Sequence, residues 1–342
     1  MKKIFLIGLT AAAMLASCSN DETVEMAQQK AIGFSNAFVN NGTRSVHDPS
    51  FTTLTLKDFA VYGFTQSGQI FNGEKVSGTT STGWSYDNVQ YWVPGNTYTF
   101  GAIAPYSVAG NVSNVKLPTG AAKVGMEVAF TNTDADQVDL LHAAPAQITG
   151  VTPTYTTPVS MTFNHQLSKV KFSFQNSVGM GYNVKVSNVK ITDAFKEGTL
   201  TVAATGNTWG GQTNKNLELN FGNVVADAST TEASFIANAA TLESYNEKLM
   251  IPMDTTATYT VTFTAGLYKG EVLLGTYNHR VEIKNVEFKL GYCYDFKASL
   301  THENITGQDE LNPIEFAVTK VEDWNKADVD KGLNVSTTQS GI

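Results

Sequence analysis

The stretch LSKVKFSF, Leu167–Phe174, decides the fold of this chain. Its apolar side chains Val170, Phe172 and Phe174 share one face, and their polar neighbours share the other. Because neighbouring side chains on a β-strand point to opposite faces of the sheet, this alternation predicts a strand with one buried face. The stretch TYTVTFT, 258–264, alternates in the same way and predicts a second strand of this kind.

Strand-like runs recur along the whole chain, separated by segments rich in Gly, Asn, Ser and Pro. Such residues mark the boundaries of strands. We find no long helical pattern, and the segment 231–249 fits a loop or a short helix equally well. The chain is therefore predicted to be all-β. The further strand-like runs are 31–39, 56–64, 89–93, 97–105, 123–130, 138–143, 281–288, 292–300 and 314–324.

The size of the chain predicts more than one domain. It has 342 residues, with 28 glycines and only 16% charged residues, a composition typical of strands and turns. One domain usually spans ~100–200 residues. The uncharged segment 148–158, rich in Pro and Thr, is the best candidate for a seam. We therefore expect two tandem β-sandwich domains, residues 31–152 and 153–324.

Residues 1–18 have the layout of a bacterial lipoprotein signal peptide. Two lysines precede an apolar run, and Leu15-Ala16-Ser17-Cys18 then reads as a lipobox. The run is shorter than the roughly 20 residues that span a bilayer as a helix. Cleavage before Cys18 would leave it as an N-terminus acylated with chains such as palmitate. The alternative is an ordinary signal peptide in which Cys18 is incidental. The polar residues 19–30 then form a tether.

Charge and cysteine content restrict the partners. The net charge of −8 argues against a nucleic-acid partner, because phosphate binding requires a basic face. The chain has two cysteines, Cys18 and Cys293. If Cys18 carries lipid, no intramolecular disulfide can form. Cys293 lies in an alternating strand pattern and is interpreted as a structural thiol.

No group of residues has the spacing of a catalytic site. The five histidines are far apart, and no nucleotide-binding or nucleophile motif occurs. We therefore predict no catalytic residue, no metal, no cofactor and no enzymatic activity. A weak exception is the acidic segment with Asp134, Asp136 and Asp139, which either binds calcium or is a solvated loop. His165 lies on the apolar face of its run and is expected to be a packed core histidine.

The four tryptophans are Trp84, Trp92, Trp209 and Trp324. In a β-sandwich such residues belong more often to a core or a domain seam than to a platform for sugars. Glycan binding by exposed aromatic side chains stays open.

Several short motifs follow one another in the order found in one family. They are the lipobox, Asp139-Leu140-Leu141-His142-Ala143, the run Phe163–Val170, Gly291-Tyr292-Cys293-Tyr294, Ile314-Glu315-Phe316 and Asp323-Trp324. In these features the chain resembles the fimbrillins, the lipoprotein-precursor (type V) pilins of Bacteroidales. His142 departs from the family, which often has an aromatic residue such as Tyr at that position.

The resemblance implies two transthyretin-like β-sandwich domains and a route of assembly. A fimbrillin precursor is lipidated, exported through the periplasm to the outer membrane and the cell surface, and cut after a basic residue. The cut falls in the loop that follows the first strand. Arg44, followed by Ser45, lies at that place and is the only arginine before Arg280. Lys30 is the lesser candidate, and the plain alternative is that Arg44 is an ordinary loop residue.

Removal of the strand 31–39 would leave unpaired backbone groups and an apolar groove. Ile32, Phe34 and Phe38 mark the pockets that a replacing strand must refill. The C-terminal tail 325–342, which includes the alternating run 333–337, is the candidate donor strand, or else a disordered end.

The expected partners are therefore copies of this chain and related pilin subunits, membrane lipid in the precursor, and a host or bacterial surface receptor. The expected function is that of a structural subunit of a cell-surface fimbria that serves adhesion or biofilm formation. The alternative is an anchored or pilus-tip lipoprotein that binds glycans or host proteins.

Overall fold

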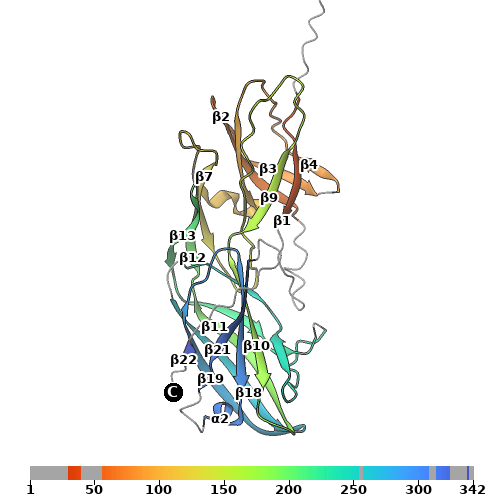
Figure 1. The fold of residues 1–342 in the computed structure, drawn as a ribbon, viewed down its shortest axis with the longest axis vertical. Coiled ribbons are helices and arrows are strands. Elements are labelled where there is room, and N and C mark those ends of the chain that lie inside the picture. The colour runs from red at the N-terminus through yellow and green to blue at the C-terminus, as the bar shows by residue number, and fades with distance from the viewer. Residues whose placement is uncertain are drawn as a thin grey trace, which may run out of the picture.

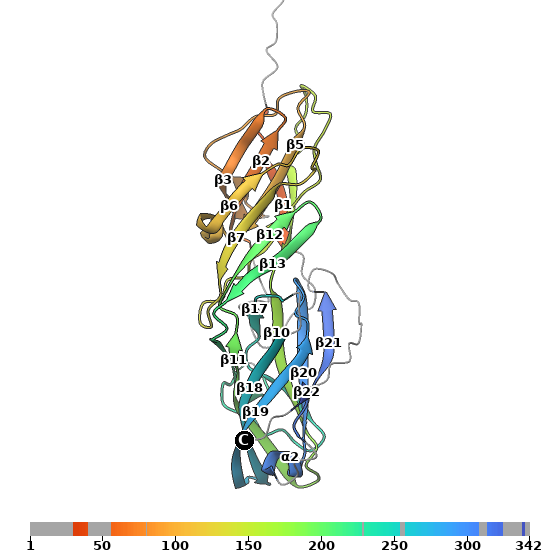
Figure 2. The same cartoon turned by 90° about the vertical axis from the view of Figure 1, so that its left-hand side faces the viewer.

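The computed structural model describes residues 30–39, 56–79, 81–227, 229–253, 257–307, 313–323 and 337–338. They form an elongated structure with four β-sheets arranged along its long axis (Figures 1 and 2). The all-β class predicted from the alternating runs is confirmed. The described helical segments are η1 (Tyr106–Asn111) and α2 (His302–Thr306), and neither has the length or the apolar character needed to cross a membrane.

Two sheets form the upper half of the molecule in Figure 1. The first has seven strands, in the order β1 (Phe34–Val39), β9 (Val159–His165), β8 (Leu141–Ala143), β5 (Tyr98–Ala104), β2 (Asp58–Thr65), β3 (Gly68–Thr79) and β4 (Gly83–Ser85). The second has four strands, in the order β13 (Gly206–Thr213), β12 (Glu197–Ala203), β7 (Gly125–Thr131) and β6 (Val112–Lys116).

Strand β2 shows how the upper half is packed, because a hydrophobic core lies on each of its faces. Tyr62 and Phe64 contribute to the core shared with the four-stranded sheet. Phe59 and Val61 contribute to a second core that also contains Phe34 of β1, and that we call the β1 core. Seven of the eight residues of β2 are buried as a result.

Two further sheets form the lower half. One consists of β15 (Val224–Val225), β16 (Thr241–Ser244), β10 (Ser168–Asn176), β20 (Tyr292–Leu300) and β21 (Phe316–Asp323), with β17 (Lys248–Met250) also paired to β10. The other consists of β14 (Leu217–Gly222), β11 (Tyr182–Ala194), β18 (Ala257–Lys269), β19 (Val272–Val286) and β22 (Thr337–Thr338).

The apolar face predicted for Leu167–Phe174 packs between these two lower sheets. Phe172 on β10 contacts Phe221 on β14 with ring centroids 4.8 Å apart, and Phe296 on β20 at 5.6 Å. Phe174 contacts Phe263 on β18 at 5.0 Å. The alternation of the opening stretch therefore places these side chains in the core that joins the two sheets.

The pairing of the strands crosses the position expected for the domain seam. β9 pairs with β1 and β8, and β12 pairs with β7 from Glu197 opposite Thr131 to Val202 opposite Met126. The upper half thus takes strands from both sides of residue 152. The boundaries 31–152 and 153–324 stay a prediction. The sheets themselves join β9, β12 and β13 to the strands that come before residue 152.

Two local expectations are corrected by the structure. The run 89–93 is not a strand, and its one bridge joins Tyr91 to Ala31. The segment 231–249 contains no helix among its described residues, and it supplies β16 and the beginning of β17.

Buried ionic and polar pairs lie where the chain passes from β9 into β10. His165 Nδ1 lies 2.8 Å from Asp139 Oδ2, and both side chains are almost wholly buried. Lys169 Nζ lies 3.1 Å from Glu247 Oε2, again with both side chains buried. His165 is therefore a packed, hydrogen-bonded histidine, as the sequence predicts.

His142 on β8 is buried and neutral. Its Nδ1 accepts a hydrogen bond from Asn207 Nδ2 at 3.1 Å, which links β8 to β13. Burial, assisted by the positive charge of Lys123, lowers the pKa of His142 to about 4. In the unfolded chain this imidazole takes up a proton below about pH 6.5, so protonation favours unfolding between the two pKa values.

The free energy of unfolding is therefore expected to fall as the pH drops from 6.5 to about 4. The substitution His142→Phe should reduce this fall by about 1–3 kcal/mol, because a phenylalanine cannot bind the proton. Urea unfolding at pH 7, 5.5 and 4.5 measures the effect. An unchanged pH dependence in the variant would contradict the assignment.

Candidate functional site: strand β1 and the groove it fills

Strand β1 is the outermost strand of the seven-stranded sheet. It pairs in parallel with β9, with Phe34 opposite Val159 and Val39 opposite Phe163. Among the described strands, none pairs with its other flank. Because an edge strand interrupts no ladder, it can leave without breaking the pairing of the strands that remain.

The residues just before β1 pair with a different segment, 90–92. We call β9 the first wall and 90–92 the second wall of the groove that holds the N-terminal segment. Ile32 N donates to Gln90 O at 2.8 Å, and Trp92 N donates to Lys30 O at 2.9 Å. The hydroxyl of Tyr86 donates to Ile32 O at 2.6 Å. The segment 30–32 therefore lies antiparallel to 90–92, whereas β1 lies parallel to β9.

The side chains of this N-terminal segment fill the β1 core. Ile32, Phe34 and Ala37 are buried. The ring of Phe34 lies among four aromatic rings, with centroids 5.5–6.2 Å away and edge-to-face geometry. These neighbours are Phe59, Phe71, Tyr86 and Phe100.

This geometry defines a groove with two walls and an aromatic pocket. A buried Phe side chain contributes about 1.5–3 kcal/mol, and each well-oriented aromatic pair adds about 0.5–1.5 kcal/mol. A segment that refills the groove must therefore supply large apolar side chains two residues apart, as Ile32 and Phe34 do. It must also supply backbone partners for β9 on one side and 90–92 on the other.

The pairing of the segment 90–92 with residues 30–32 could not be predicted from the sequence. The sequence pattern of the run 89–93 predicts a strand. In the structure it is an extended segment whose Trp92 side chain points into the β1 core. The pattern indicates the extended conformation of this run, but it does not identify the segment with which the backbone pairs.

Several predicted site residues lie outside the described part of the chain. These are Cys18, Arg44 and Ser45, and most of the tail 325–342. Lys30 is the first residue of the described chain. Of the tail, Thr337 and Thr338 pair with Ile283 and Glu282 at the edge of β19.

The acidic segment 131–139 does not bring its carboxylates together. Asp134 accepts a hydrogen bond from Asn220 N at 2.7 Å and lies 3.0 Å from Lys248 Nζ. Asp139 is the partner of His165. No group of potential metal ligands occurs among the residues that the structure describes. The calcium hypothesis therefore has no support here.

The other residues singled out in the sequence serve packing. Trp92 and Trp209 are buried and Trp84 is half-buried, so none of these three is a flat exposed platform for a sugar. Burial raises the pKa of the Cys293 thiol to about 12, which keeps it protonated. Trp324 lies outside the described residues.

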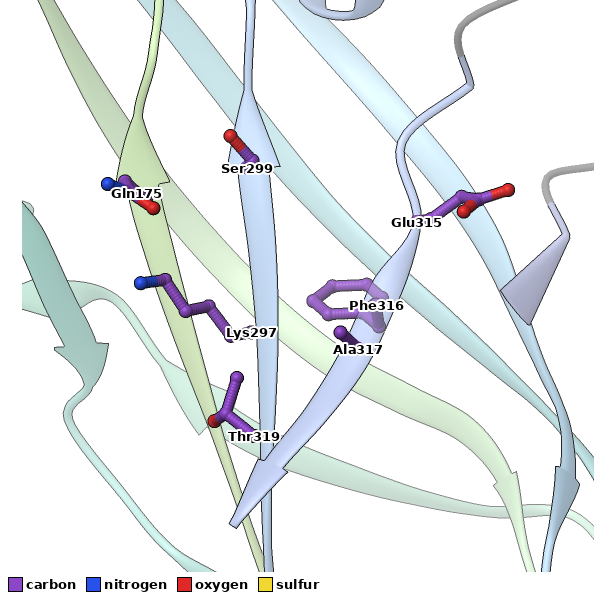
Figure 3. A pocket seen from close by; sticks show the side chains of 7 residues that line it. All are labelled: Gln175, Lys297, Ser299, Glu315, Phe316, Ala317 and Thr319. Carbon is purple, nitrogen blue, oxygen red and sulfur yellow. The ribbon is translucent and has the colours of Figure 1, made fainter. Parts of the chain in front are cut away.

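A shallow pocket of about 430 Å³ lies on the outer face of β10, β20 and β21 (Figure 3). Lys297 of β20 reaches across β10 there, and Thr319 stands on the exposed side of β21. Ser299 Oγ lies 2.7 Å from Ser177 Oγ, so the serine hydroxyl of this pocket is paired with another serine and not with Glu315. Its lining residues are Gln175, Lys297, Ser299, Glu315, Phe316, Ala317 and Thr319.

Comparisons with known proteins agree with this architecture. No curated protein matched the sequence. A fimbrial protein from Bacteroides vulgatus is similar in structure with a TM-score of 0.57 and 16% identity, over 86% of this chain and 99% of that one. A candidate cell adhesion protein from Bacteroides ovatus has a TM-score of 0.51 and 18% identity, over 87% and 98%. At these identities the likeness shows the fold alone. The fimbrillin-like family matches residues 43–324, and the chain therefore belongs to that family.

Proposed function

We propose that this chain is a structural subunit of a cell-surface fimbria, assembled by exchange of strand β1. The observation that supports the proposal is the position of β1. Phe34 and Ala37 of β1 are buried in the β1 core, yet β1 pairs with β9 alone among the described strands. Ile32, just before β1, is buried in the same core. Membership of the fimbrillin-like family supports a structural role over an enzymatic one.

The assembly begins with export of a lipoprotein precursor. Acylation of Cys18 holds the precursor at the outer membrane after passage through the periplasm, with about 0.8 kcal/mol for each buried methylene. A protease then cuts between Arg44 and Ser45 at the cell surface. The released fragment contains the whole of β1 and residues 30–32, which together fill the groove.

The emptied groove then binds a strand from another copy of the chain or from a related pilin. Unpaired buried backbone groups cost about 1–3 kcal/mol each, so a new strand is favoured. The tail 325–342 is the proposed donor, because Leu333 and Val335 repeat the two-residue spacing of Ile32 and Phe34. Such head-to-tail contacts extend into a filament, which serves adhesion or biofilm formation.

Cleavage at Arg44 is tested with an Arg-specific protease added to purified precursor. The wild-type chain should acquire Ser45 as its new N-terminus and polymerise, whereas Arg44→Gln should stay intact and monomeric. Lys30→Gln, at the lesser cleavage candidate, should behave as the wild type does. N-terminal sequencing and size-exclusion chromatography with light scattering measure both effects. A cut far from Ser45, or a trimmed chain that stays monomeric, rejects the proposal.

The contribution of Phe34 to the binding of β1 in the groove is tested with Phe34→Ala in the precursor. Removing a buried Phe side chain costs about 3–5 kcal/mol, so the N-terminal segment should detach more often. Hydrogen exchange of the β9 amides, measured by mass spectrometry, should then become faster. Ser35→Ala, on the opposite face of β1, should leave the exchange unchanged. Equal protection in Phe34→Ala and the wild type would show that the aromatic pocket does not retain the strand.

Lipidation is tested by growing cells with a labelled palmitate analogue. The label should enter the wild-type precursor and Cys293→Ala, and it should be absent from Cys18→Ala. The unlabelled variant should also leave the detergent phase in a Triton X-114 partition, because it lacks the acyl chains. Label found on Cys18→Ala would place the acylation elsewhere.

A further inference from the structure

The exposed large apolar side chains of the described residues fall into two separate groups. One group is the row Val89, Tyr91 and Val93, with 43–46% of each residue exposed. We call it the upper row. The other group is the lower tip, which consists of Met180, Phe235, Val272, Leu273 and Leu274.

The lower tip is formed by the turn between β18 and β19 at the lower end of the molecule (Figures 1 and 2). Gly270 N donates to Gly181 O at 3.0 Å, which places the loop of Met180 beside this turn. Phe235 contacts Tyr268 of β18 with ring centroids 4.9 Å apart.

Exposure of three successive residues shows that the β18–β19 hairpin extends beyond its sandwich. Val272, Leu273 and Leu274 are 68%, 51% and 50% exposed. Because neighbouring side chains on a strand point to opposite faces, both faces of the hairpin are bare at this point. Free sheet edges are usually protected by charged side chains. Residues 272–279 contain no Asp, Glu, Lys or Arg and therefore lack this protection.

The upper row borders the groove of β1 at the other end of the chain's fold. Its three side chains point outward from the segment whose backbone pairs with 30–32, while Trp92 points inward. It is therefore continuous with the surface on which the proposed strand exchange takes place.

We propose that the lower tip of one copy docks on the upper row of the next copy, as a contact additional to the exchanged strand. The inference rests on the proposed fimbrial assembly. A head-to-tail filament needs two different surfaces that fit one another, and this chain presents two apolar surfaces in separate places. Exposed apolar patches that persist on a protein commonly mark interaction sites.

The charges beside the two surfaces suit this arrangement. Lys185, which lies over the ring of Phe235, and the exposed Lys269 flank the lower tip, together with Glu271. The upper row begins after Asp87, and Asn88 binds the carboxylate of Glu74. Cleavage at Arg44 removes Lys30 from this surface, so trimming makes the upper row more acidic.

Cross-linking between two single-cysteine variants tests the contact. Trimmed Leu273→Cys and trimmed Tyr91→Cys are mixed, polymerised and treated with a short bismaleimide. Cross-linked pairs should form in the mixture and not with either variant alone. Both variants also carry Cys293→Ala, so that the half-buried Cys293 does not compete for the reagent. The control replaces Leu273→Cys by Thr319→Cys, an exposed position on β21 that should give no cross-link with Tyr91→Cys.

Charge exchange provides the second measurement. Leu273→Asp should slow polymer growth at least tenfold, because it places a carboxylate against the acidic upper row. The chain that carries both Leu273→Asp and Tyr91→Lys should recover most of the wild-type rate. Both positions are exposed, so melting temperatures should stay within a few degrees of the wild type.

The outcomes separate this inference from the function on which it rests. If the trimmed wild type polymerises, but the cross-link is absent and Leu273→Asp grows normally, the contact is wrong and the strand exchange stands. If Leu273→Asp loses binding to phosphatidylethanolamine–phosphatidylglycerol vesicles while it polymerises normally, the lower tip is a membrane surface and the contact is wrong. If the trimmed wild type never polymerises, both are rejected.

Discussion

The structure depends on a strand that is buried by its side chains and yet bonded along one flank. Phe34 lies in a pocket of four aromatic rings, so the N-terminal segment is retained mainly by apolar and aromatic contacts. Its backbone, in contrast, has few partners: β1 pairs with β9 alone among the described strands, and residues 30–32 pair only with the short segment 90–92. Under the proposed cleavage, this combination would retain the segment in the intact chain and would let it leave the cut one.

The lower half of the molecule does not depend on the packing of the N-terminal segment. The lower core, with Phe172 and Phe174 at its centre, shares no side chain with the β1 core. Buried pairs such as Lys169 with Glu247 lie at the passage between the halves. Breaking a buried pair of this kind costs about 3–5 kcal/mol, so the geometry of this passage is strongly specified. A subunit can therefore open its groove without loosening its other half.

The strands could be predicted from the sequence where the pattern is local. The alternation of Leu167–Phe174 and of 258–264 predicts β10 and β18, since a period of two needs no knowledge of the partner strand. The pairing of β12 with β7 could not be predicted, because residues about seventy positions apart become neighbours only in the fold. The same holds for the groove. Phe34 reads as a core residue, but its pocket is assembled from β2, β3, β5 and the segment after β4.

The position of β12 and β13 in the upper half has a consequence for how the chain folds during its synthesis on the ribosome. The four-stranded sheet cannot close until Thr213 has been synthesised, by which time β10 and β11 of the lower half already exist. Domains that are continuous in sequence fold one after another as they emerge. Here the two halves are interleaved, so the flank of β7 that pairs with β12 must stay unpaired until β12 has been synthesised. A holding chaperone would be most needed during that interval.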